Sequence, residues 1–257
     1  MIEVKRERHV LKNLFQDYDW NYLVEAVLDG TMGVAWANGE RDPQVGVVGY
    51  PYIRLFVLAG DPAHPAGKGF IAGIDETSAL VLPSPGWVDL LKQSHPDGIV
   101  ERTRYAFSSE SLDVDRLKKL ASQVPAGYDL VPMQLKEARQ LANEKSRFSE
   151  DHFLNFDSID QFIKKGFGFC MMKGGEIVCA ATTFVVCKRG IEIQINTREE
   201  YRGKGLATAT AAQLMLYSLE VGLDPSWDAA NEISARLAVK LGYSRRGTYM
   251  MYVVVKD

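Results

Sequence analysis

The stretch GIEIQINTREEYRGKGLATATAA, residues 190–212, decides the fold of the second half of the chain. It opens with strict alternation: isoleucines take one face of an extended segment, and Glu192, Gln194 and Asn196 take the other. A central strand covered on both faces would be apolar throughout. Residues 190–197 are therefore expected to form a strand whose polar face either meets solvent in an antiparallel sheet or lines a wet cleft.

A glycine-bearing loop, Gly203-Lys204-Gly205, follows this strand and leads into an alanine-rich helix. The two glycines allow a tight backbone turn, and the first turn of a helix presents N–H groups that lack helical partners. Such a helix start suits a phosphate or pyrophosphate, and Arg202 and Lys204 add positive charge. The alternative is an ordinary glycine-rich turn before a buried helix, with two exposed basic residues.

Other phosphate-binding motifs fit this loop less well. The P-loop pattern of Gly, four residues and Gly-Lys-Ser/Thr does not occur in the chain. The dinucleotide fingerprint needs a third Gly or Ala where this chain has Thr208. A dinucleotide-binding oxidoreductase therefore rests on Gly203-Lys204-Gly205 alone.

Outward from this stretch, the second half predicts an α/β domain with a mixed, mostly antiparallel sheet flanked by helices. Apolar periodicity, with glycines at turn positions, marks the boundaries of its elements. We expect strands at 128–131, 167–172, 177–186, 190–197, 226–229 and 248–255, and helices at 135–145, 159–165, 206–221 and 232–241.

The first half predicts a smaller α+β lobe. Strands are expected at 33–37, 53–58 and 100–107, helices within 10–29 and at 87–93, and a long turn-rich loop at 59–69. A charged helical stretch ends at Val124-Pro125-Ala126-Gly127, where proline and glycine break the pattern. We therefore expect two domains, 1–125 and 126–257.

Composition excludes several classes of function. The chain has 257 residues, of which 46% are hydrophobic and 25% charged, as in globular proteins. Thirty basic and thirty-three acidic residues give a net charge of −3, which supports neither a nucleic-acid partner nor an anionic membrane surface. There is no apolar run long enough to span a membrane and no signal-peptide pattern at the start, so a cytoplasmic protein is expected.

Histidine and cysteine give no sign of a metal or redox site. His64 and His95 stand beside prolines, far apart and without ligand spacing, and are expected on the surface. The three cysteines, Cys170, Cys179 and Cys187, lie in apolar strand-like sequence without a spaced histidine. They are expected to be reduced core residues rather than nucleophiles.

Two segments carry a family resemblance. Arg202-x-x-Gly205-x-Ala207 resembles the Arg/Gln-x-x-Gly-x-Gly/Ala signature of the GNAT (GCN5-related) N-acyltransferase superfamily, and the run from Asn231 to Lys240-Leu241-Gly242-Tyr243 resembles its Asn…Lys-Leu-Gly-Phe/Tyr helix. The resemblance covers about residues 127–257. Residues 201–209 and 225–229, behind an obscure first half, also resemble the branch related to the zwittermicin A resistance acetyltransferase. The first lobe would then be a degenerate copy of the same fold, without catalysis.

The resemblance implies direct transfer of an acetyl group from acetyl-CoA, as co-substrate and without a metal, to a primary amine of a small molecule. The loop would bind the CoA pyrophosphate, the end of the strand would pair with the pantetheine arm, and the Ile195 N–H would polarise the thioester carbonyl. Asn231 would lie near the acyl end, although a helix N-cap explains an Asn there equally well. The implied CoA-binding residues are Ile195, Asn196, Thr197, Arg202, Gly203, Lys204, Gly205, Leu206, Ala207, Thr208 and Asn231.

The resemblance also suggests catalytic residues. Glu192 stands where relatives often carry a glutamate and is the candidate general base; the alternative is a solvated strand carboxylate. Relatives often carry a tyrosine acid where this chain has Ala238, so Ser234, one turn earlier, is the candidate group for the leaving thiolate. Tyr243 and Tyr249 are further possibilities.

Acceptor specificity is expected from residues 145–166 and from the first lobe. Residues 146–153 mix charge and aromatics, as a binding lid or an ordinary amphipathic cover would. Because Ala238 replaces the tyrosine, a non-catalytic CoA-binding sensor or scaffold is the main alternative function. The sequence leaves the acceptor, the acyl chain length and the oligomeric state open.

Overall fold

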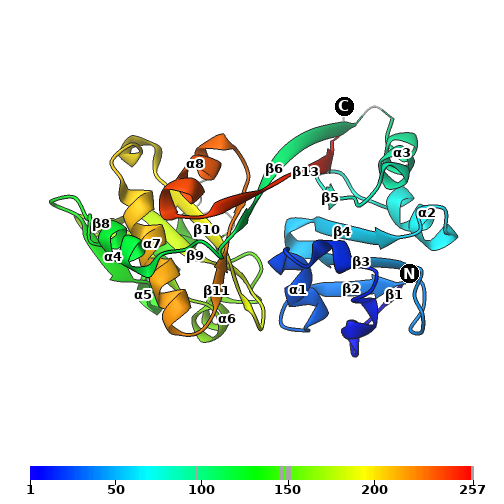
Figure 1. Cartoon of the computed structure of the whole chain (residues 1–257), viewed down its shortest axis with the longest axis horizontal. Coiled ribbons are helices and arrows are strands. Elements are labelled where there is room, and N and C mark those ends of the chain that lie inside the picture. Colours follow the sequence, from blue (N-terminus) through cyan, green and yellow to red (C-terminus); the bar gives the residue numbers. More distant parts are fainter. Residues whose placement is uncertain (97, 145–147, 149–151, 256–257) are drawn as a thin grey trace. The chain divides into compact units, whose positions relative to one another are not determined.

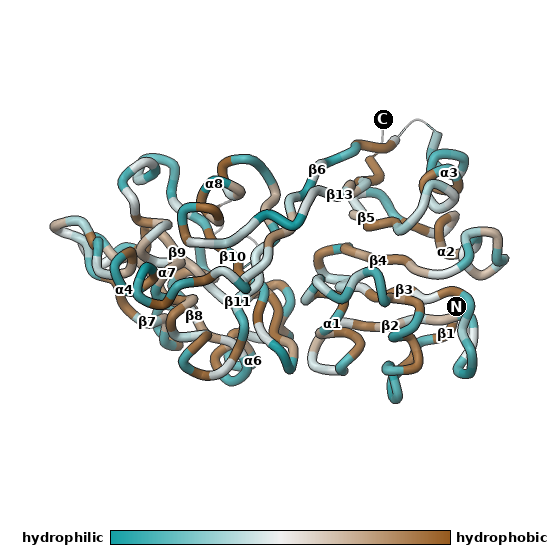
Figure 2. Tube along the Cα trace, viewed as in Figure 1, coloured by the Kyte–Doolittle hydropathy of each residue, from teal (hydrophilic) through white to brown (hydrophobic). Residues whose placement is uncertain are grey.

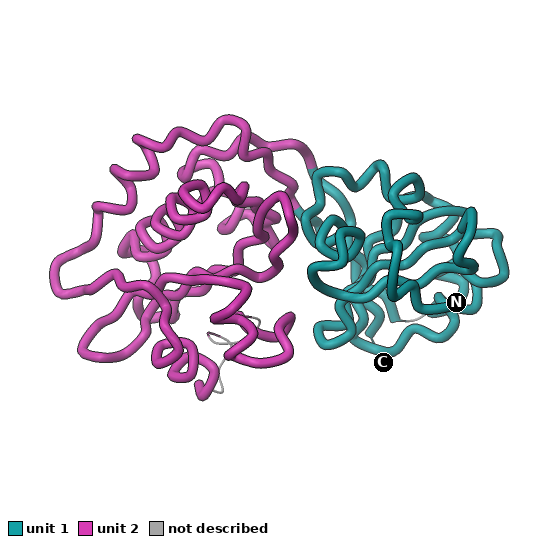
Figure 3. Tube along the Cα trace, turned by 90° about the horizontal axis from the view of Figure 1, so that it is seen from below, with its two compact units in different colours: residues 1–104, 248–257 teal, residues 105–247 magenta. Residues whose placement is uncertain are grey.

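The computed structural model describes residues 1–96, 98–144, 148 and 152–255. The chain divides into two compact units (Figure 3). Unit 1 comprises Met1–Arg104 and Thr248–Asp257, and unit 2 comprises Tyr105–Gly247. Two long strands, β6 (Ile99–Ser108) and β13 (Ser244–Val254), contain the unit boundaries.

Unit 2 contains a five-stranded sheet in the order β11-β10-β9-β8-β7. Strands β7 to β10 pair antiparallel, whereas β10 and β11 run parallel. The β8–β9 hairpin turns through Gly174 and Gly175, both at positive φ, as the sequence predicts. The strands are β7 (Asp129–Pro132), β8 (Gly168–Lys173), β9 (Glu176–Val186), β10 (Gly190–Thr197) and β11 (Asp224–Ser226).

Helices flank this sheet (Figure 1). The long α7 packs against β8, β9 and β10 over a buried cluster that includes Met171, Cys179 and Leu206, and α5 packs against β9. The helices of unit 2 are α4 (Val114–Ala121), α5 (Leu135–Asn143), α6 (Ile159–Lys165), α7 (Leu206–Glu220) and α8 (Glu232–Leu241), with a 3₁₀ turn at Glu199–Tyr201. The predicted mixed, mostly antiparallel sheet flanked by helices is confirmed.

Strands β1 to β5 of unit 1 belong to an eight-stranded sheet in the order β1-β2-β3-β4-β5-β13-β6-β12. In it β1 to β4 pair antiparallel, β4 and β5 run parallel, and β5 pairs antiparallel with β13. Strands β3 and β4 carry much of the hydrophobic sequence of this unit (Figure 2). Its elements are β1 (Ile2–Glu3), α1 (Tyr22–Leu28), β2 (Val34–Ala37), β3 (Val45–Tyr50), β4 (Leu55–Gly60), α2 (Pro65–Ala72), β5 (Ala79–Val81) and α3 (Pro85–Ser94), with 3₁₀ turns at Arg8–Leu11, Gln16–Tyr18 and Pro51–Ile53.

In the first half one expectation is wrong and one strand was missed. The stretch predicted as a long loop, 59–69, contains the first part of α2, because Pro65 occupies the first helical position and Gly67 gives room to the ring of Trp87. The strand β3 was not predicted at all. The predicted break near residue 125 lies within unit 2, which also contains the preceding helix α4, packed against α7.

None of the helices in the described part of the chain is long and apolar enough to cross a membrane.

Candidate functional site

The loop between β10 and α7 presents a row of backbone donors. Within the described structure, the N–H groups of residues 203–208 have no intramolecular acceptor. The first helical bond of α7 is from the N–H of Ala209 to the carbonyl of Gly205. Six consecutive donors therefore lie at the positive end of a fifteen-residue helix, as an anion would require.

Glycine gives this loop its shape. Gly203 has φ of 76° and Gly205 has φ of 83°, in the left-handed region that side chains disfavour. A Cβ added at either residue would meet no heavy atom within 4 Å, so the surface above the loop is open. The glycines are required here for conformation rather than for close packing.

The charged side chains of the loop are held by backbone carbonyls. Arg202 Nε donates to the Thr197 carbonyl at 3.2 Å, and Lys204 Nζ donates to the Glu200 carbonyl at 2.9 Å while lying over the ring of Tyr201. Leu206 is buried in the core cluster and anchors the start of the helix. Thr208 is also buried, and Ala207 is half-buried. The predicted loop residues are thus brought together at one helix end.

Beside this loop, the pairing of strand β10 with β11 ends. The parallel ladder to β11 has three pairs and ends with Glu192 opposite Ser226. Residues 193–197 pair with β9 on one side, and no described strand pairs with them on the other. Ile195, Asn196 and Thr197 therefore belong to a strand segment that has a partner strand on one side only among the described strands, and this segment leads into the donor loop (residues 203–208).

The polar side of β10 is buried at Glu192 and half-buried at Gln194 and Asn196. Glu192 is only 5% exposed, and its Oε1 accepts a hydrogen bond from the Asp228 N–H at 2.8 Å. The alternative of a solvated strand carboxylate is therefore wrong. Gln194 and Asn196 are half-buried, and Asn196 Nδ2 donates to the Phe148 carbonyl at 3.2 Å.

Asn231 and Ser234 lie at the first turn of α8. Asn231 Oδ1 accepts from the Ser234 N–H at 3.0 Å, so its expected role as N-cap is confirmed. Ser234 Oγ accepts from Trp227 Nε1 at 3.1 Å. Because the hydroxyl accepts from the indole, its own hydrogen is available to donate to another group.

The tyrosine alternatives for the acid differ in their surroundings. Tyr243 is buried, and its hydroxyl donates to the Pro225 carbonyl at 2.9 Å. Tyr249 belongs to unit 1, where its ring packs against Trp20. Ala238 is fully buried.

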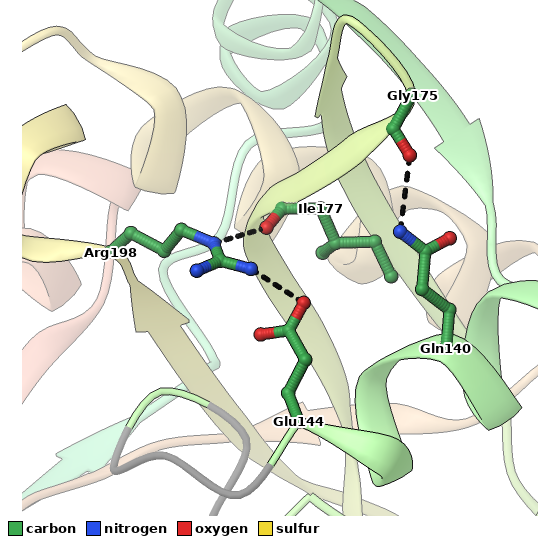
Figure 4. Close-up of polar contacts among 5 residues, drawn as sticks. All are labelled: Gln140, Glu144, Gly175, Ile177 and Arg198. Carbon is green, nitrogen blue, oxygen red and sulfur yellow. Dashed lines mark hydrogen bonds and ion pairs between the residues drawn. The ribbon is translucent and has the colours of Figure 1, made fainter.

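Arg198 is a residue that the sequence analysis missed. Figure 4 shows its guanidinium between two partners: Nε donates to the Ile177 carbonyl at 2.7 Å, and Nη2 contacts Glu144 Oε1 at 2.5 Å. Burial raises the pKa of the Glu144 carboxyl, and Arg198 opposes this shift. The guanidinium also lies 4.9 Å from the ring centre of Phe148. The only sequence signal was a basic residue directly after a strand.

The described residues offer neither a reactive thiol nor a metal centre. Cys170, Cys179 and Cys187 form no disulfide and are buried, and burial raises the pKa of Cys179 to about 11. A thiol with that pKa stays protonated at neutral pH, which fits the expectation of core cysteines. Among the described histidine, cysteine and acidic residues, no group of three or more could hold a metal ion.

Comparisons with known proteins agree with this geometry. A family model described as GNAT acetyltransferase matches residues 12–252. The chain is 30% identical to the uncharacterized N-acetyltransferase YdfB of Bacillus subtilis strain 168, over 96% of each chain. Among solved structures, a GCN5-related N-acetyltransferase-like protein from Streptococcus suis 89/1591 is 32% identical with a TM-score of 0.86, covering 96% of this chain and 98% of that one.

A more distant structure shares the fold. A GCN5-related N-acetyltransferase from Kribbella flavida is 16% identical with a TM-score of 0.57, covering 83% of this chain and 88% of that one. The family match extends over both units, including the first half, where no motif was found. The donor loop, the separation of β10 from β11 after Glu192 and these matches together show that the chain belongs to the GNAT acetyltransferase family.

Proposed function

We propose that this protein transfers the acetyl group of acetyl-CoA directly to a primary amine of a small molecule. The observation that carries the proposal is the row of N–H groups at residues 203–208, which have no acceptor within the described structure. A diphosphate carries the oxygen acceptors and the negative charge that such a row needs. Arg202 stands at the start of the row and adds a positive charge.

The edge of β10 that no described strand pairs with suits the rest of the acetyl-CoA molecule. The pantetheine arm contains amides, which can pair with the backbone of residues 195–197 as a short extra strand would. In this arrangement the Ile195 N–H polarises the thioester carbonyl. Asn231, at the start of α8, would lie near the acyl end of the arm.

The chemistry then needs few protein groups. The ammonium of the acceptor loses a proton to water, and its nitrogen attacks the thioester carbon. The carbon–sulfur bond then breaks, and the second proton that the nitrogen loses passes to the departing CoA sulfur, which leaves as the thiol. Ser234 can donate a hydrogen bond from its hydroxyl to that sulfur, since its oxygen already accepts from Trp227. Gln194, half-buried on the polar face of β10, would orient water or the acceptor.

A second candidate function is binding of CoA without turnover. It is favoured by Ala238, which is buried and carries no proton where relatives often have a tyrosine. Both functions use the same donor loop, so only turnover separates them. Incubation with acetyl-CoA and a panel of small amines, with free thiol measured over time, distinguishes the two.

Donor binding is tested first by thermal unfolding with acetyl-CoA, and with NADH as the comparison ligand. Acetyl-CoA at about 100 times its dissociation constant should add about 2.7 kcal/mol to the free energy of unfolding. Stabilisation by NADH alone would refute the proposal. Stabilisation by acetyl-CoA without thiol release would favour the second candidate.

A further inference from the structure

The point where β10 and β11 part is built from buried side chains. Pro225 in β11 has no N–H to give to the ladder, and β10 has a bulge between Glu192 and Ile193. After Ser226 the chain continues into β12 (Asp228–Ala229), which pairs with β6 instead. No described strand pairs with this side of β10 beyond Glu192, because β11 ends at Ser226 and the next strand, β12, pairs with β6.

Glu192 joins the two sides of this divergence. Its Oε1 accepts a hydrogen bond from the N–H of Asp228 at 2.8 Å. Asp228 is the first residue of β12, which pairs with β6. Glu192 is itself the last residue of β10 that pairs with β11. The Glu192 side chain therefore connects the end of the β10–β11 ladder to the first residue of β12.

The residue between these strands depends on the same contact. Trp227 lies directly before Asp228, is 3% exposed, and donates from Nε1 to Ser234 Oγ. Fixing the Asp228 backbone therefore fixes the neighbouring indole and, through it, the Ser234 hydroxyl. Tyr243 holds the middle of β11 by donating a hydrogen bond to the Pro225 carbonyl.

From these contacts we infer that Glu192 is a positioning residue that holds β11 and β12 away from residues 193–197, so that this edge stays open to an acyl-CoA arm. This inference rests on the proposed function. The role requires a hydrogen-bond acceptor at Oε1 and does not require a base. It differs in that respect from the general-base role expected from the sequence.

Two variants separate the roles. E192Q keeps an oxygen acceptor of the same reach and removes basicity, whereas E192L keeps the approximate size and removes the acceptor. For the positioning role, E192L should raise the KM for acetyl-CoA at least tenfold over E192Q, and E192Q should restore most of the kcat that E192L loses. For a general base, both variants should lose kcat alike, by about 100-fold or more, with an unchanged KM.

Calorimetric titration with acetyl-CoA keeps the test independent of turnover. Weaker binding by E192L than by E192Q supports the inference even if wild-type protein releases no thiol, an outcome that would refute only the proposed transfer. Equal affinity of the two variants would overturn the inference. Circular dichroism monitors folding of both variants, and if E192L is unfolded, a loss of kcat in E192Q at unchanged affinity overturns the inference by itself.

Discussion

Both units contain three antiparallel strands followed by a helix and a parallel strand, but the N–H groups at the start of that helix have different partners in the two units. In unit 1, antiparallel strands β2, β3 and β4 are followed by α2 and then by β5, parallel to β4. In unit 2, antiparallel strands β8, β9 and β10 are followed by α7 and then by β11, parallel to β10. Each unit therefore has a strand that leads through a loop into a helix start.

The donors at the helix start of unit 1 are used internally. Asp61 Oδ1 accepts from the Ala63 N–H, His64 Nδ1 accepts from the Ala66 N–H, and Pro65 has no N–H. The Asp61 carboxylate would also repel an anion. In unit 2 the corresponding donors have no acceptor within the described structure. Both units thus place a helix start after a strand, and the side chains around it decide whether its N–H donors are available for the proposed phosphate site.

Reversal of charge at the loop of unit 2 should have the largest effect. In Arg202→Glu a carboxylate lies beside the proposed diphosphate, so we expect the dissociation constant for acetyl-CoA to rise about 100-fold, or about 2.7 kcal/mol. Lys68→Glu, on the exposed side of α2 in unit 1, is the matched control and should change affinity less than about twofold. Calorimetry measures both, and equal affinities would show that the anion site lies elsewhere.

Glycine should matter for conformation in one unit and not in the other. Gly205→Ala forces a side chain into φ of 83°, which we expect to lower the free energy of unfolding by about 1–2 kcal/mol. Gly69→Ala, in the interior of α2 with open space around it, should raise it by about 0.5–1 kcal/mol. Urea unfolding measures both, and a change of the same sign in the two variants would contradict the comparison.

Local signals explain what the sequence could predict. Strand β10 and helix α8 have the predicted bounds, because alternation marks the first and Asn231 and Gly242 cap the second. Helix α2 was missed because Pro65 and its glycines resemble a loop. Its helical state depends on packing, since Gly67 lies against Trp87, twenty residues along the chain.

In the candidate site, too, only the features that depend on neighbouring residues were predicted. The glycine loop was predicted from adjacent residues, whereas Glu192 contacts Asp228 across 36 positions and Arg198 contacts Glu144 across 54. No spacing pattern encodes such pairs. The bulge after Glu192 also depends on the register with β9, which alternation alone does not reveal.

The units also differ in their histidines, and unit 2 should lose stability in acid. His152 is fully buried with Nδ1 2.8 Å from Thr182 Oγ1, and burial lowers the pKa of His152 to about 3. The unfolded chain takes up this proton near pH 6.5, so the free energy of unfolding falls as the pH drops below 6.5. Between pH 7 and 5.5 the loss should be about 1 kcal/mol.

Urea unfolding at both pH values checks this prediction against His152→Asn, whose amide can bond Thr182 without titrating. The variant should lose less stability than wild type over this interval. An equal loss would mean that another group is responsible.

Removal of the side-chain cap at the start of α2 in unit 1 should have the smallest effect. His64→Ala removes the acceptor of the Ala66 N–H, so the free energy of unfolding should fall by about 0.5–1 kcal/mol. It should not create a second site for acetyl-CoA, because Pro65 still offers no donor and Asp61 keeps its charge. Calorimetric stoichiometry tests this: a second equivalent bound by the variant would show that a single cap, rather than the whole arrangement of donors and charge, separates the two units.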